Sequence, residues 1–92
     1  MKTSVFMIEG EPECQTMVMR LLAGSSLLDV TGVADSVAQA KPHIDRHECE
    51  VFLVNTVLPD GSGIDLMRHI QARQPRAKIL AVSRSEEHTS EL

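Results

Sequence analysis

The chain has 92 residues and a formal net charge of -4, which limits it to one domain without a basic surface for nucleic acid. Apolar residues make up 42% of it and aromatic residues only 2%, so its core must consist of Val, Leu, Ile, Met and Ala. No apolar run is long enough for a signal peptide or a membrane span, and Cys14 and Cys49 form no metal or disulfide pattern, so we expect a soluble, cytoplasmic protein.

The first two predicted elements are a strand and a helix. Residues 4–8 form a nearly continuous apolar run that stops at Glu9 and Gly10. Such runs, without alternation, are typical of strands covered on both faces. Pro12 suits a first helical turn, and apolar residues then recur at helical spacing up to Gly24. These recurring residues are Cys14, Met17, Val18, Leu21 and Leu22.

A second strand and helix follow in the same order. Residues 27–34 predict the strand, and Ser36 is a suitable N-cap for the helix. Pro42 lies inside the helical pattern, where we expect it to kink or shorten the helix. The side of this helix that carries apolar residues consists of Val37, Ala40 and Ile44.

The third strand is predicted over residues 51–54 and ends at Asn55. A turn-rich loop leads into a helix over residues 63–73, and residues 77–83 close the series as a fourth strand. One stripe of the third helix contains Ile64, Met67 and Ile70. The methionines at helical spacing, Met17, Met19 and Met67, are assigned to core packing.

The strict alternation of strands and helices indicates an α/β fold, with a parallel sheet and helices on both faces. Functional groups of such sheets gather outside the carboxyl ends of the strands. These ends are Glu9, Asn55 and Ser83. With the strand order 2-1-3-4, the first and third strands are neighbours, so Glu9 and Asn55 should face the same crevice.

Three segments resemble the receiver domain of bacterial two-component response regulators: "MIEGEP", "FLVNTVLPDGSG" and "ILAVS". The resemblance covers residues 4–83 and implies a CheY-like, flavodoxin-like sheet, here its N-terminal part, truncated after the fourth strand. It also implies phosphorelay signal transduction rather than enzymatic activity, with a sensor histidine kinase or another signalling protein as partner. The loop "LPDGSG" is similar to that of regulators with a C-terminal DNA-binding output domain.

The resemblance also implies a role for each site position. The phosphoacceptor of the family falls on Asn55, and its acidic pair falls on Glu9 and Gly10. The backbone carbonyl of Val57 would join Glu9 and Asn55 in the metal site, and the switch hydroxyl would be Ser83.

Two of these positions depart from the family pattern. An amide oxygen carries no full charge, so Asn55 is a very poor nucleophile for phosphoryl transfer. Mg2+ prefers charged oxygen ligands, and Gly10 and Asn55 leave only Glu9, with Glu11 nearby. We therefore expect weak Mg2+ binding and no phosphorylation at Asn55. The module would then be a pseudo-receiver that signals through protein-protein contacts.

Two rival functions remain open. The first is a conventional phosphoaccepting receiver, using another carboxylate, that controls a DNA-binding output domain. Asp60 could be taken for such a substitute, but its position between Pro59 and Gly61 is ordinary turn chemistry. The second is a flavin or nucleotide binding module of the same fold, which the carboxylates in "EGEPE" disfavour, since phosphate needs bare N–H groups.

His43 and His47 have the spacing of metal ligands on one helix face, with Glu48 and Cys49 beside them. Pro42 disturbs that helix, and the sequence lacks the glutamate of the zincin motif between the histidines. We therefore interpret them as a solvated helix end.

Residues 84–92, "RSEEHTSEL", break with the preceding pattern because they are polar and have no apolar periodicity. The same residues result from in-frame translation of a common sequencing-adapter DNA. We interpret them as a non-native tail, which leaves residues 1–83 as a partial receiver domain.

Overall fold

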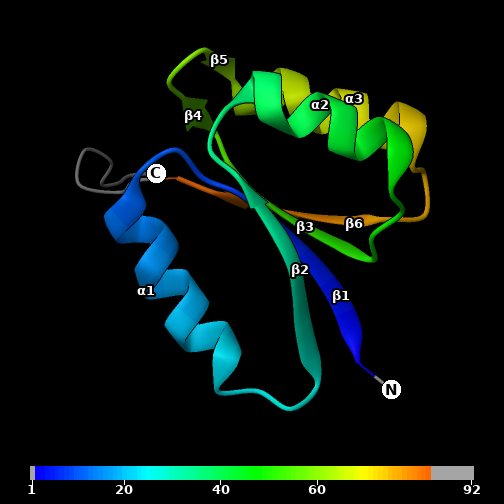
Figure 1. The fold of residues 1–92 in the computed structure, drawn as a ribbon. Coiled ribbons are helices and arrows are strands. Elements are labelled where there is room, and N and C mark those ends of the chain that lie inside the picture. Colours follow the sequence, from blue (N-terminus) through cyan, green and yellow to red (C-terminus); the bar gives the residue numbers. More distant parts are fainter. Residues whose placement is uncertain (1, 84–92) are drawn as a thin grey trace, which may run out of the picture.

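The computed structural model describes residues 2–83, which form a four-stranded parallel sheet between helices (Figure 1). The strand order is β2-β1-β3-β6. The strands span Thr3–Ile8 (β1), Leu28–Ala34 (β2), Val51–Asn55 (β3) and Lys78–Val82 (β6). Both the α/β class and the strand order 2-1-3-4 are confirmed.

Helix α1 (Pro12–Ala23) lies on one face of the sheet, and helices α2 (Val37–Arg46) and α3 (Gly63–Arg73) lie together on the other (Figure 1). Pro12 occupies the first turn of α1, as predicted. The Ser36 hydroxyl caps α2 by accepting a hydrogen bond from the Gln39 N–H at 3.1 Å. Pro42 does not end α2, because the helix continues past it to Arg46.

The loop after β3 contains two short strands that the sequence did not predict. They are β4 (Val57–Leu58) and β5 (Gly61–Ser62), and they pair antiparallel. Two-residue strands carry no periodicity, so only turn chemistry marked this segment in the sequence. The hairpin places Pro59 and Asp60 between the carboxyl end of β3 and the start of α3.

The core is thicker on the α2 and α3 side of the sheet. There the cluster includes Phe6, Ile8, Phe52, Val54, Ala40, Ile44, Leu66 and Ile70. On the α1 side, the buried residues are Val5, Met7 and Leu53, which pack against Val18, Met19 and Leu22 of α1. Helix α1 itself has no fully buried residue.

The prediction that Met17, Leu21 and Ile64 belong to the buried sides of their helices is wrong. Met17 is 58% exposed, Leu21 is 73% exposed and Ile64 is 50% exposed. Helical spacing gives the width of an apolar stripe, but the centre of the buried part depends on how the helix is rotated against the sheet. In α3 that centre is Leu66 and Ile70, and Ile64 falls outside it. Among the described residues, no helix is long and apolar enough to cross a membrane.

Candidate functional site at the carboxyl edge of the sheet

Glu9 and Asn55 meet at the carboxyl edge of the sheet. Glu9 follows β1 directly, Asn55 is the last residue of β3, and the two strands pair with Ile8 opposite Val54. Both polar side chains are nearly buried, each at 5% exposure. The structure therefore brings together the two residues that the sequence placed at one crevice.

The Asn55 carboxamide points at the Glu9 carboxylate. Its Nδ2 donates hydrogen bonds to both carboxylate oxygens, Oε1 at 2.9 Å and Oε2 at 3.0 Å. Its Oδ1 accepts the backbone N–H of Val57 at 2.9 Å. The amide orientation follows from these partners, because the reverse orientation would set Oδ1 against a carboxylate and Nδ2 against an N–H donor.

Two further contacts hold Glu9 in place. The backbone N–H of Glu11 donates to Glu9 Oε2 at 3.1 Å, and the Gln15 side chain on α1 donates to the Glu9 carbonyl. Gln15 was not singled out from the sequence. It lies six residues after Glu9, in the first turns of α1, and no sequence pattern marks this contact. Two donor groups, the Asn55 amide and the Glu11 N–H, make three hydrogen bonds to the Glu9 carboxylate, so this buried side chain has its hydrogen-bonding capacity largely used.

Gly10 and Glu11, two other predicted site positions, follow Glu9 directly in the chain. Gly10 is wedged between neighbours, since a Cβ there would lie 2.7 Å from Pro59 Cδ and 3.1 Å from the Asp35 carbonyl oxygen. A carboxylate at position 10 would therefore require Pro59 to move. The Glu11 side chain is exposed, and its Oε1 lies 3.8 Å from Cys14 Sγ on α1.

Ser83 follows Val82, which is the register partner of Asn55 in the β3–β6 pair. It therefore lies at the same edge of the sheet, and it is exposed. Within residues 2–83, no hydrogen bond joins its hydroxyl to Glu9 or Asn55.

The geometry at this edge bears on the expected weak Mg2+ binding, which stays a prediction. A divalent cation needs several hard oxygen ligands, most of them charged or from water. Among residues 2–83, Glu9 is the one carboxylate that is hydrogen-bonded to Asn55. The Asn55 N–H hydrogens point toward it, and Asn55 Oδ1 already accepts the Val57 N–H. The Asn55 N–H hydrogens point at the Glu9 carboxylate, where a cation bound by both residues would lie.

Asp60 acts as a helix cap, which differs from the role of a substitute phosphoacceptor. Its Oδ1 accepts the N–H of Val37 at 2.7 Å and its Oδ2 accepts the N–H of Ala38 at 3.0 Å. These backbone hydrogen bonds hold the pKa of the Asp60 carboxyl below its usual value. The carboxylate thus caps the first turn of α2 from the β4–β5 turn.

His43 and His47 lie close together, but the geometry is that of packing. The His43 ring stacks on Phe6 with centroids 3.8 Å apart and planes 11° apart, and its centroid lies 4.7 Å from that of His47. Burial lowers the pKa of His43, and the neighbouring His47 lowers it further. In the part of the chain that the structure covers, no group of three or more His, Cys, Asp or Glu side chains is arranged to hold a metal.

The sheet is parallel and has helices on both faces, a Glu follows β1, and the β4–β5 hairpin follows β3. Together these features point to a class of signalling domain. The family model described as "Response regulator receiver domain" matches residues 5–91, and the chain belongs to that family. It is therefore a receiver domain of two-component signalling, a class of modules that generally carry no enzymatic activity of their own. The interpretation of residues 84–92 as a non-native tail stays a prediction, since they lie outside the described residues.

Curated relatives include transcription regulators. The chain is 34% identical over 79 residues to the DNA-binding transcriptional activator DevR/DosR of Mycobacterium tuberculosis, covering 86% of this chain and 36% of that protein. It is 26% identical over 80 residues to the transcriptional regulatory protein CitB of Klebsiella pneumoniae, covering 87% and 34%. The chain spans about a third of the length of these relatives.

Solved structures confirm the fold. The MaeR response regulator bound to beryllium trifluoride matches with a TM-score of 0.81 and 20% identity, over 92% of this chain and 70% of that one. A CheY-like receiver domain from Methanospirillum hungatei matches with a TM-score of 0.81 and 16% identity, over 90% and 65%. The flavodoxin-like class expected from the sequence is confirmed.

Proposed function

We propose that this receiver relays its signal through protein-protein contacts, with conventional phosphotransfer disabled at Asn55. The observation that carries the proposal is the pair of hydrogen bonds from Asn55 Nδ2 to both oxygens of Glu9. Phosphoryl transfer to a side chain needs a nucleophilic oxygen and a cation that neutralises the developing charge. The amide supplies neither, and it uses the Glu9 carboxylate as its own hydrogen-bond acceptor.

The same geometry supports weak Mg2+ binding. A cation would have to displace the Asn55 N–H groups from Glu9 and would gain a single carboxylate in exchange. Since no catalytic residue is left in this arrangement, Glu9 and Asn55 act as a structural pair that fixes the carboxyl edge of the sheet.

A sensor histidine kinase or another signalling protein is the proposed partner, and control of a C-terminal DNA-binding output domain is the proposed downstream role. The support comes from the relatives, which are described as a DNA-binding transcriptional activator and a transcriptional regulatory protein. The domain itself carries no basic block, so we place any nucleic-acid contact outside this segment.

The test is incubation of the chain with Mg2+ and a small phosphodonor, followed by intact-mass measurement. We expect no phosphoryl adduct, and we expect the Asn55→Asp variant to acquire one that is lost under mild alkali, as an acyl phosphate should be. A labile adduct on the unaltered chain would overturn the proposal.

The matched control is Asp60→Asn, which removes the nearest other carboxylate of the loop while leaving Asn55 in place. The hydrogen bonds from Val37 and Ala38 already engage both Asp60 oxygens, so this variant should behave like the unaltered chain. If the unaltered chain were phosphorylated and Asp60→Asn were not, the conventional receiver with a substitute acceptor would be the correct function.

A further inference from the structure

The β4–β5 hairpin, residues 57–62, lies between the Glu9–Asn55 pair and the start of α2 (Figure 1). Its two strands pair through Val57 opposite Ser62 and Leu58 opposite Gly61. The Leu58 side chain is buried and belongs to the core cluster beneath α2 and α3. The hairpin is therefore a packed element of the fold and not a free surface loop.

At its first strand, the hairpin is bonded to the carboxyl edge of the sheet. The Val57 N–H donates to Asn55 Oδ1 at 2.9 Å, and Asn55 Nδ2 donates to both Glu9 oxygens. Asn55 thus uses both ends of its carboxamide, the amide nitrogen toward Glu9 and the oxygen toward the hairpin. Any shift of the Asn55 side chain would change the hydrogen bond that holds Val57.

At its turn, the hairpin is bonded to α2. Asp60 Oδ1 accepts the Val37 N–H at 2.7 Å, and Asp60 Oδ2 accepts the Ala38 N–H at 3.0 Å. The first N–H groups of a helix have no partner inside the helix, and the Ser36 hydroxyl takes only that of Gln39. The amides of Val37 and Ala38 therefore depend on a residue that is 23 and 22 positions away from them in the chain.

A third contact joins the same turn to the segment after β1. A Cβ on Gly10 would lie 2.7 Å from Pro59 Cδ, so the Pro59 ring already packs against the Gly10 backbone. Gly10 follows Glu9 directly in the chain. The hairpin therefore contacts both members of the buried pair, Asn55 through a hydrogen bond and Glu9 through its neighbour.

We propose that the β4–β5 hairpin is a latch that couples Asn55 to the first turn of α2. In the latched state, Asn55 holds the Val57 N–H and Asp60 holds two amides of α2, as in this structure. In the unlatched state, the hairpin withdraws from α2, and all three amides become open to water together. A contact at the carboxyl edge that favours either state then changes the start of α2. Because coupling free energies are reciprocal, a contact on the first turn of α2 changes the carboxyl edge by the same amount.

A simpler role for Asp60 is that of a local helix cap, which would affect α2 alone. The two roles differ at the Val57 N–H, whose partner is Asn55 and not Asp60. If Asp60 is only a cap, its removal leaves the exchange of the Val57 amide with water unchanged. If the hairpin is a latch, the same removal also speeds exchange at Val57.

The experiment is residue-resolved amide hydrogen exchange, measured by NMR on the chain and its Asp60→Ala variant. Asp60 is exposed, so its truncation leaves the core intact. The Val37 and Ala38 amides should exchange about tenfold faster, because their acceptor is lost, and the Val57 amide about twofold to fivefold faster. Asp60→Asn keeps one acceptor oxygen, so it should protect one of the two α2 amides and release Val57 less.

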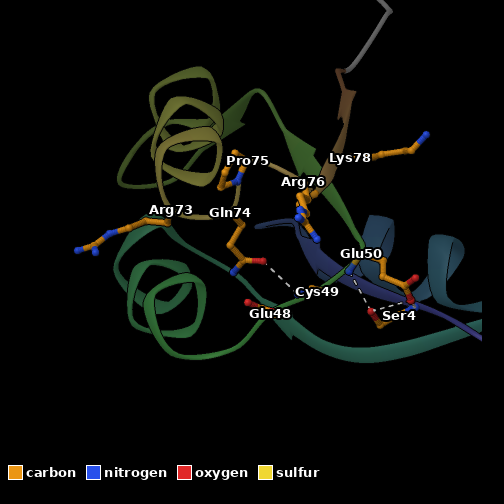
Figure 2. Close-up of a pocket in the computed structure, with 10 residues that line it drawn as sticks. Ser4, Glu48, Cys49, Glu50, Arg73, Gln74, Pro75, Arg76 and Lys78 are labelled. Carbon is orange, nitrogen blue, oxygen red and sulfur yellow. Dashed lines mark hydrogen bonds between the residues drawn. The ribbon is translucent and has the colours of Figure 1, made fainter.

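Glu48→Ala is the matched control. It removes an acidic charge from an exposed position just after the other end of α2, in a groove at the amino-terminal edge of the sheet (Figure 2). It should leave all three amides unchanged. An unchanged Val57 amide in Asp60→Ala, or equal changes in Glu48→Ala, would overturn the latch. If Asp60→Ala does not fold, the Val57 amide of Asp60→Asn decides in the same way. None of these variants alters Asn55 and no phosphodonor is present, so the outcome is independent of the proposed signalling function.

Discussion

At the scale of a single residue, the exchange of one carboxylate oxygen for an NH2 group changes what the carboxyl edge can do. Two carboxylates about 3 Å apart repel, and one of them is forced to take up a proton or share a cation. The Asn55 amide removes that conflict by donating to both Glu9 oxygens. The edge thus holds a hydrogen-bonded pair in place of two facing carboxylates.

His43 is the residue whose protonation the fold opposes most clearly. Burial and the neighbouring His47 lower its pKa below the ordinary value of 6.5. A base with a depressed pKa binds fewer protons in the folded than in the unfolded chain, so its stabilising contribution is complete above 6.5 and is lost as the pH falls toward the folded pKa.

We therefore expect the thermal midpoint to fall on acidification below pH 6.5. His47→Gln should reduce the fall by removing one of its two causes, and His43→Gln should remove this part of the dependence. Circular dichroism melts at closely spaced pH values measure the effect. Identical pH profiles for the unaltered chain and His43→Gln would contradict the assignment.

At the scale of elements, the junction between β3 and α3 depends on a missing side chain. A Cβ on Gly63 would lie 1.9 Å from the Asn55 carbonyl oxygen and 2.8 Å from the Asn55 carbonyl carbon. The Gly63 N–H donates to the Thr56 carbonyl at 2.9 Å, which fixes the first turn of α3 against the end of β3. The helix can start this close to the site only because residue 63 is glycine.

Gly63→Ala should destabilise the fold by about 3 kcal/mol or more, because backbone atoms must separate to admit the methyl group. Gly24→Ala is the matched control, since its Cβ would meet only the Leu21 carbonyl oxygen at an ordinary 3.6 Å and its backbone is helical. It should be neutral or slightly stabilising. Urea unfolding of both variants measures the difference, and equal free energies of unfolding would show that α3 is not held in this way.

At the scale of the whole molecule, the arrangement of elements follows from the apolar runs. Continuous runs such as residues 51–54 predicted strands covered on both faces, and the alternation with helices predicted a parallel sheet. The meeting of Glu9 and Asn55 followed from that order, because the ends of neighbouring parallel strands share an edge.

Other features depend on tertiary packing that no local pattern contains. The exposure of Met17 and Leu21 depends on the rotation of α1 and on its being the single described helix on that face (Figure 1). The capping of α2 by Asp60 joins residues 37 and 60 across the fold. A groove at the amino-terminal edge of the sheet similarly combines Ser4, residues 48–50 and residues 73–78, which are far apart in the chain.

The central claim, that the Asn55 amide takes the place of a cation beside Glu9, is tested most directly by unfolding the chain and its Asn55→Asp variant with and without Mg2+, at matched ionic strength and neutral pH. We predict that the unaltered chain is insensitive to Mg2+. The variant should be about 1–3 kcal/mol less stable without the ion, because an unpaired carboxylate then faces Glu9, and Mg2+ should recover part of that loss. Equal stabilisation of both proteins by Mg2+, or a variant as stable as the unaltered chain without it, would contradict the account.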